Sequence, residues 1–73
     1  MTVLGLYLVK KSINKAEISR KTGISASRLS ELTLNLNAHL RAKELYLIAM
    51  AIDVDPCELV KIVCADVRLI GKE

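Results

Sequence analysis

The sequence predicts an all-α fold of five short helices followed by a C-terminal tail. Apolar residues recur at spacings of three and four along most of the chain, and short breaks with helix-capping residues separate these segments. Of the 73 residues, 52% are hydrophobic and only 3% are aromatic, which indicates an aliphatic core. A chain of this length has no room for a second core, so we expect a single domain over residues 1–73.

The first two helices are predicted from an apolar stripe and a capping pattern. The stripe begins at Val3 and gives way to two lysines, which stabilise a helix C-terminus. Asn14 and Glu17 then form a pattern that resembles a capping box, and Gly23 supplies a residue that tolerates the left-handed conformation at a helix end. The second helix is therefore expected over about residues 15–22.

The third and fourth helices follow the same logic. Ser25 is the expected cap of a third helix over about residues 26–34. Its apolar stripe consists of Leu29, Leu32 and Leu36. The polar stretch NLNAH then breaks the pattern, and a fourth helix is expected over about residues 41–52. The buried face of this helix consists of Leu45, Ile48, Ala49 and Ile52.

The last segment contains a fifth helix and an ambiguous tail. Pro56 is placed to start the helix, because its fixed φ suits the first helical position. The expected core residues of this helix are Leu59, Val60 and Val63. The remaining ADVRLIGKE fits a short strand, a helix extension or a docked tail, and its β-branched residues favour the strand slightly.

The charge of the chain is divided between its two halves. Residues 1–43 carry a net charge of +6, whereas residues 44–73 carry −3. A basic half attracts polyanions, of which a nucleic-acid backbone is the commonest in a cell. An unevenly charged, solvated surface is the alternative that composition alone leaves open.

Other function classes find little support in the sequence. Cys57 and Cys64 lie seven residues apart without a second pair, and we interpret them as buried free thiols. His39 has no carboxylate partner at helical spacing, so we expect no enzyme activity, metal or cofactor. The apolar N-terminal stretch is nine residues long, which fits neither a signal peptide nor a membrane span, and we expect a soluble cytoplasmic protein.

Residues 15–34 meet the requirements of a helix-turn-helix. This motif needs a small residue where two helices cross, a turn residue that tolerates positive φ, and apolar residues at fixed offsets that set the crossing angle. Ile18 is the expected inward anchor of the first helix of the pair. The other places are filled by Ser19, Gly23, Ile24, Leu29 and Leu32.

Two longer segments carry a family resemblance. INKAEISRKTGISASRLSEL and LYLIAMAIDVDPCELV are similar to the five-helix domain of the lambda repressor and Cro-like family, also called the XRE family, over about residues 4–63. Lys15 stands where members usually carry a Gln that contacts a phosphate, Thr22 occupies a usually apolar site, and Asn35 replaces a common Gly. The loop at residues 34–40 is one residue longer than usual and lacks a Pro.

The resemblance implies double-stranded DNA as the partner, with the third helix in the major groove. Arg28 can bond to guanine, whereas Glu31 either accepts from a cytosine amine or pairs with Arg28, and we favour the pair slightly. The expected base contacts are Ala26, Ser27, Arg28, Ser30 and Glu31. The expected phosphate contacts are Lys15, Ser25, Asn35, Asn37 and Arg41.

Two functions remain after this reading. The favoured one is a sequence-specific DNA-binding transcriptional regulator, expected to be a repressor and a homodimer, because one recognition helix reads few base pairs. Its expected dimer interface consists of Val60, Ile62, Val67, Leu69 and Ile70. The alternative is a protein-interaction module on the same fold, such as an antitoxin subunit, for which the apolar Leu34, Leu36 and tail provide a surface.

Overall fold

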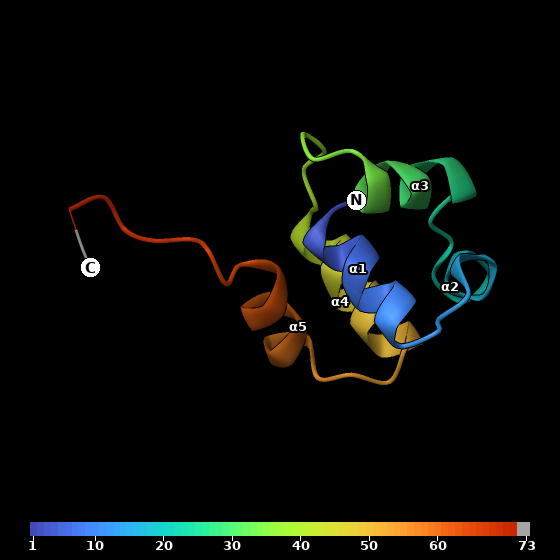
Figure 1. Ribbon diagram of the computed structural model, residues 1–73. Coiled ribbons are helices and arrows are strands. Elements are labelled where there is room, and N and C mark those ends of the chain that lie inside the picture. The colour runs from blue at the N-terminus through green and yellow to red at the C-terminus, as the bar shows by residue number, and fades with distance from the viewer. Residues whose placement is uncertain (72–73) are drawn as a thin grey trace.

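The computed structural model describes residues 1–71, and within them five helices are joined by turns and loops without a strand (Figure 1). The helices are α1 (Val3–Lys10), α2 (Lys15–Thr22), α3 (Ala26–Leu34), α4 (Ala42–Ala51) and α5 (Pro56–Val63). The all-α prediction is confirmed, and the bounds of α2 and α3 are those expected from the sequence. The slight preference for a strand in the tail was wrong over residues 65–71, where the chain forms turns and extended backbone that runs away from α5.

Local capping explains where α2 and α3 begin and end. The Asn14 side chain accepts a hydrogen bond from Ala16 N at 2.8 Å, and the Ser25 hydroxyl accepts from Arg28 N at 3.1 Å. Gly23 ends α2 at φ 81°, in the left-handed region that favours glycine. Glu17 does not complete the expected capping box, because its carboxylate pairs instead with Arg20 one turn later.

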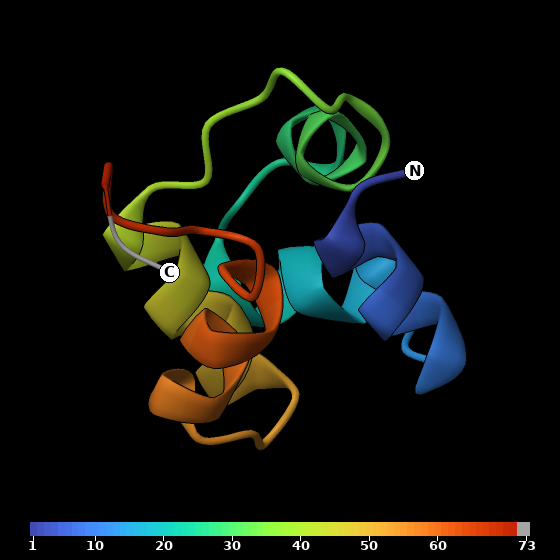
Figure 2. The same cartoon turned by 60° about the vertical axis from the view of Figure 1, so that its left-hand side comes forward.

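The core is aliphatic and draws on all five helices. Figure 2 shows α5 in front of α4, with α3 seen nearly end-on above the other helices. The buried apolar residues are Leu4, Leu8, Ile18, Ile24, Leu29, Leu32, Ile48, Ala49 and Leu59. Two expected core residues face solvent: Leu36 lies beyond the end of α3 and is 76% exposed, and Val60 is on the outer side of α5 and is 42% exposed. Cys57 and Cys64 are free but exposed, so the prediction of buried thiols was wrong about their burial.

The turn between α2 and α3 is fixed by hydroxyl groups. Ser19 Oγ donates to the carbonyl of Ile24 at 2.7 Å, which ties α2 to the residue that follows the turn. Thr22 Oγ1 donates to Ile18 O at 2.7 Å and accepts from Ile24 N at 3.1 Å. Because its hydroxyl is bonded in both directions, Thr22 is accommodated at a position where the resembled family usually has an apolar residue.

The C-terminal end of α3 is held by the beginning of α1. Thr2 N donates to Thr33 O at 2.9 Å, and Thr2 Oγ1 donates to Leu32 O at 2.8 Å. Gly5 lies so close to α3 that a Cβ there would clash with the Thr33 carbonyl oxygen. These contacts satisfy carbonyls that the last turn of a helix leaves without partners, and they fix α3 at this end.

Candidate nucleic-acid interface

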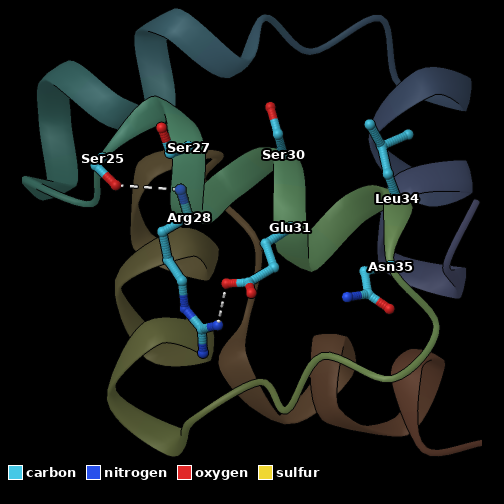
Figure 3. Close-up of a pocket in the computed structure, with 7 residues that line it drawn as sticks. All are labelled: Ser25, Ser27, Arg28, Ser30, Glu31, Leu34 and Asn35. Carbon is cyan, nitrogen blue, oxygen red and sulfur yellow. Dashed lines mark hydrogen bonds and ion pairs between the residues drawn. The ribbon is translucent and has the colours of Figure 1, made fainter.

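The outer surface of α3 is the candidate interface. Figure 3 shows the hydroxyls of Ser27 and Ser30 pointing to one side of α3, while Arg28 and Glu31 point to the other, toward the loop that follows α3. Ser27 is exposed and Ser30 is half-buried beside it. The surface therefore presents short hydroxyl side chains, with the exposed methyl group of Ala26 at the first position of the helix.

Arg28 is bound inside the protein rather than projecting from it. Its guanidinium donates to Glu44 through Nε at 2.7 Å and through Nη2 at 3.0 Å. The same group donates to Glu31 Oε1 at 2.8 Å and to the carbonyl oxygen of His39 at 2.7 Å. Arg28 thus joins α3, the loop after it and α4, and its side chain is only 25% exposed.

The charges of this cluster reinforce one another. The hydrogen bonds from Arg28, together with the backbone N–H of Arg41, hold the pKa of the Glu44 carboxyl below its usual range despite partial burial. The two carboxylates raise the pKa of the Arg28 guanidinium, chiefly through the hydrogen bonds that it donates to Glu44 and then to Glu31. One cation with two carboxylates leaves the cluster net negative, so Arg28 adds no positive field to the face of α3.

The structure separates the two interpretations of Glu31. Its Oε1 lies 2.8 Å from Arg28 Nη1, three residues earlier on the same helix, so the intrahelical pair favoured from the sequence is confirmed. The Glu31 side chain remains 50% exposed. The guanine contact expected of Arg28 competes with four hydrogen bonds that the side chain already makes.

The expected phosphate contacts are spread around both ends of α3. Lys15 begins α2, and its Nζ lies 3.4 Å from Thr33 Oγ1 near the C-terminal end of α3. Ser25 lies at the other end of α3, where its hydroxyl is used as the cap. Asn35 and Asn37 are exposed in the loop, and the Asn35 side chain accepts from Asn37 N at 2.9 Å. Arg41 is exposed at the N-cap of α4.

The other cations of the basic half differ in how free they are. Arg20 is paired with Glu17 at 2.8 Å on the surface of α2. Lys21 lies 3.5 Å from the Ala51 carbonyl oxygen, and Lys43 is exposed on α4. These positions fit solvated side chains.

The residues expected at a dimer interface lie on and beyond α5. Val60 is exposed on α5, and Ile62 is half-buried. Val67, Leu69 and Ile70 are 66%, 72% and 104% exposed along the tail. Figure 1 shows this tail leading away from the helices, on the opposite side of the molecule from α2 and α3.

Three residues that shape this site had no role in the sequence prediction. Glu44 binds Arg28 across 16 positions of sequence, and its only local signal is its place three residues after Arg41, whose N–H it accepts at 3.0 Å. Thr33 is buried, and its hydroxyl donates to Leu29 O at 2.9 Å. Gly5 gave no signal, because its small size matters only where α1 approaches the backbone of α3.

Comparison with known proteins adds an independent finding. A family model described as Cro/C1-type HTH DNA-binding domain matches residues 4–65. No curated protein and no solved structure matches the chain. Across residues 1–71, none of the helices has the length and apolar run needed to cross a bilayer. In the same part of the chain, no three His, Cys, Asp or Glu side chains gather as a metal site requires.

Proposed function

Because the chain belongs to the Cro/C1-type HTH DNA-binding domain family, we propose that it is a sequence-specific transcriptional repressor that places α3 in the major groove of double-stranded DNA. The observation that carries this proposal is the outer surface of α3, where Ala26, Ser27 and Ser30 stand on a helix fixed at both ends. A rigid helix with short side chains allows the close approach that contacts with base edges need.

The proposed reading of bases rests on hydroxyl and methyl groups. Ser27 and Ser30 can bond to several base edges, and the Ala26 methyl can contact a thymine methyl. Arg28 and Glu31 remain expected base contacts only if DNA draws the guanidinium away from its protein partners. We therefore assign Arg28 a positioning role as its main one, because its guanidinium already bonds to Glu44, Glu31 and the His39 carbonyl oxygen.

Phosphate contacts supply most of the proposed affinity. The proposed cationic contacts are Lys15, whose Nζ lies 3.4 Å from Thr33 Oγ1 of α3, and Arg41, which is exposed at the N-cap of α4, while Ser25, Asn35 and Asn37 offer uncharged donors. Such contacts set the register on the duplex without specifying sequence. Because contacts with phosphates release counterions from the duplex, the affinity is expected to fall steeply as the salt concentration rises.

A dimer completes the proposal. One α3 reads too few base pairs for useful specificity, so we propose a homodimer through α5 and the tail, with the recognition helices about 34 Å apart. The exposed Val60, Val67, Leu69 and Ile70 support this placement. The acidic C-terminal half also keeps this face away from phosphates. For a transcriptional regulator of this kind we propose a cytoplasmic location.

A second candidate is supported by exposed apolar residues near α3. Leu34 and Leu36 are 55% and 76% exposed beside the candidate interface, which suits a protein partner such as a toxin bound by an antitoxin subunit. In that case the surface of α3 binds a protein, and binding to duplex DNA is weak and independent of sequence.

Selection from random duplexes followed by titration separates the two functions. The DNA-binding proposal expects an enriched half-site, a steep dependence of affinity on salt, and loss of binding in Ser27→Glu. Met50→Glu is the matched control, because it adds the same charge at a 56% exposed position on α4. Absence of any enriched sequence, with equal weak binding by both variants, contradicts the proposal and favours the interaction module.

A further inference from the structure

We propose that the outer face of α1 binds a protein partner, which presents an apolar helix face with carboxylates near one end. The surface consists of Val3, Leu6 and Val9, with Lys10 and Lys11 at the C-terminal end of the helix. It lies on a different helix from the serines proposed to read bases, and outside the dimer proposed through α5 and the tail. The inference therefore goes beyond the proposed function and does not depend on it.

The sequence of α1 is apolar on nearly all sides. In VLGLYLVK the one charged residue is the last. Leu4 and Leu8 are buried in the core, whereas Val3, Leu6 and Val9 are exposed, and Figure 1 shows α1 in front of α4. A helix that is apolar all round is normally covered all round. The monomer therefore leaves half of this requirement unmet.

The exposed residues of α1 form one stripe. Val3, Leu6 and Val9 are three residues apart, so they follow one another along one side of the helix. A hollow beside Val9, lined also by Met1 and Leu34, offers a place for one side chain of the partner. Single exposed aliphatic residues are ordinary, but a contiguous apolar patch rimmed by polar residues marks an interaction surface.

Charge at one end of the stripe indicates the kind of partner. Residues 1–16 contain Lys10, Lys11 and Lys15 but no Asp or Glu. Within residues 1–71, neither Lys10 nor Lys11 pairs with a carboxylate. Lys11 is held beside the stripe, with its Nζ 5.5 Å from the centre of the Tyr7 ring. A partner helix with leucines along one face and Glu or Asp at one end complements both features.

The charges and the length of α1 argue against two other occupants. Two α1 helices packed on each other offer no carboxylate from their own residues to the lysines. A membrane would meet only one side of a helix about 12 Å long, because Leu4 and Leu8 stay in the core. A second copy and a lipid surface are therefore outcomes that contradict the proposal.

Three designed, fluorescently labelled peptides test the surface with the full chain. The first is an amphipathic helix of Leu, Ala and Gln with Glu in the turn at one end. The second has the same composition with its leucines distributed around the helix, and the third has Lys in place of each Glu. By fluorescence anisotropy we expect the first to bind at least about tenfold more tightly than the others, because only it matches both stripe and charge.

Substitutions in α1 connect peptide binding to this surface. Leu6→Glu should weaken binding of the first peptide at least about tenfold. Met50→Glu, which adds the same charge at an exposed position on α4, should bind as wild type does. Lys10→Glu with Lys11→Glu should reverse the preference between the first and third peptides. Urea unfolding checks that each variant folds, and the double variant decides if Leu6→Glu does not.

Four results overturn the proposal. The first two are equal binding of all three peptides and binding that Leu6→Glu leaves unchanged in a folded chain. The third is self-association that Leu6→Glu weakens and Met50→Glu does not, which assigns the surface to a second copy. The fourth is binding to phosphatidylglycerol vesicles that Leu6→Glu abolishes, without any preference among the peptides, which assigns it to lipid. Binding of the selected duplex is measured separately, so failure of the DNA-binding function leaves these results unaffected.

Discussion

Arg28 on α3 and Glu44 on α4 form a two-point ion pair, with Nε–Oε2 at 2.7 Å and Nη2–Oε1 at 3.0 Å. The Glu44 side chain is only 13% exposed, so the pair is shielded from solvent more than the surface pair of Glu17 and Arg20. Bidentate geometry fixes both distance and direction. The ion pair therefore ties the first turn of α3 to α4.

This pair makes stability dependent on pH. The pKa of Glu44 is lowered in the folded state, mainly by the Arg28 hydrogen bonds, so its stabilising effect is present above the unfolded pKa and is lost as pH falls through the folded pKa. We expect Glu44→Gln to lower the free energy of unfolding at pH 7 by about 1–3 kcal/mol. The free energy of unfolding of Glu44→Gln should fall less steeply from pH 5 to pH 3 than that of wild type. Urea unfolding at each pH measures both effects.

The matched control is Glu31→Gln. This change removes the more exposed partner of Arg28 and should cost at most about 1 kcal/mol at pH 7. Equal losses of unfolding free energy in the two variants would show that the Arg28–Glu44 pair contributes no more to stability than the more exposed Arg28–Glu31 pair.

A positioning role for Arg28 predicts how DNA affinity changes. Arg28→Ala and Glu44→Gln should weaken binding to the selected duplex and to its single-base-pair variants by similar factors, because both loosen the same helix. Ser27→Ala should alter preference at one base pair only. Fluorescence anisotropy against the duplex set measures this. A loss of about 1–3 kcal/mol confined to one guanine position in Arg28→Ala, and absent in Glu44→Gln, would restore the direct contact expected from the sequence.

Replacing Lys15 should change how the affinity for DNA depends on salt. If its ammonium contacts a phosphate, Lys15→Gln should weaken binding to all duplexes alike and reduce the logarithmic salt slope by about one. Lys10→Gln is the control with the same chemical change at an exposed position on α1, and it should leave the slope as in wild type. A slope that stays unchanged in Lys15→Gln removes this residue from the phosphate contacts.

Replacing Gly5 by alanine should lower the stability of the fold, whereas helix propensity alone would predict a gain. Alanine favours an isolated helix over glycine by about 1 kcal/mol. At this position, however, a Cβ would clash with the Thr33 carbonyl oxygen, so Gly5→Ala should destabilise the fold by about 1–3 kcal/mol. Leu6→Ala, at a 53% exposed neighbour, should change stability by no more than about 0.5 kcal/mol. Thermal and urea unfolding compare them, and a stabilised Gly5→Ala would mean that α1 and α3 lie farther apart.

A charged residue in the tail should weaken self-association. Leu69 is 72% exposed, so Leu69→Asp should leave the monomer folded while weakening the proposed dimer and lowering operator affinity. Met50→Asp, at an exposed position on α4, is the control. Sedimentation equilibrium measures the dissociation constant. A wild-type chain that remains monomeric at high micromolar concentration without DNA contradicts a preformed dimer.

The helices of this protein were determined largely by local sequence. The ends of α2 and α3 are fixed by Asn14, Gly23 and Ser25 through contacts within a few residues, so these ends can be predicted from the sequence. The apolar stripes likewise identified Ile18, Leu29 and Ile48 as core residues, because helical periodicity alone sets which positions share a face. The same local patterns led to the helix-turn-helix and to its family.

The tertiary structure decided what those helices present. Whether Arg28 points to DNA or to Glu44 depends on where the fold places α4 relative to α3, and no local pattern encodes a contact across 16 residues. The exposure of Cys57 and Cys64 likewise depends on which face of α5 meets the core. Periodicity identifies residues that share a face, but only packing between distant segments determines whether that face is covered, since burial is a property of the assembled core.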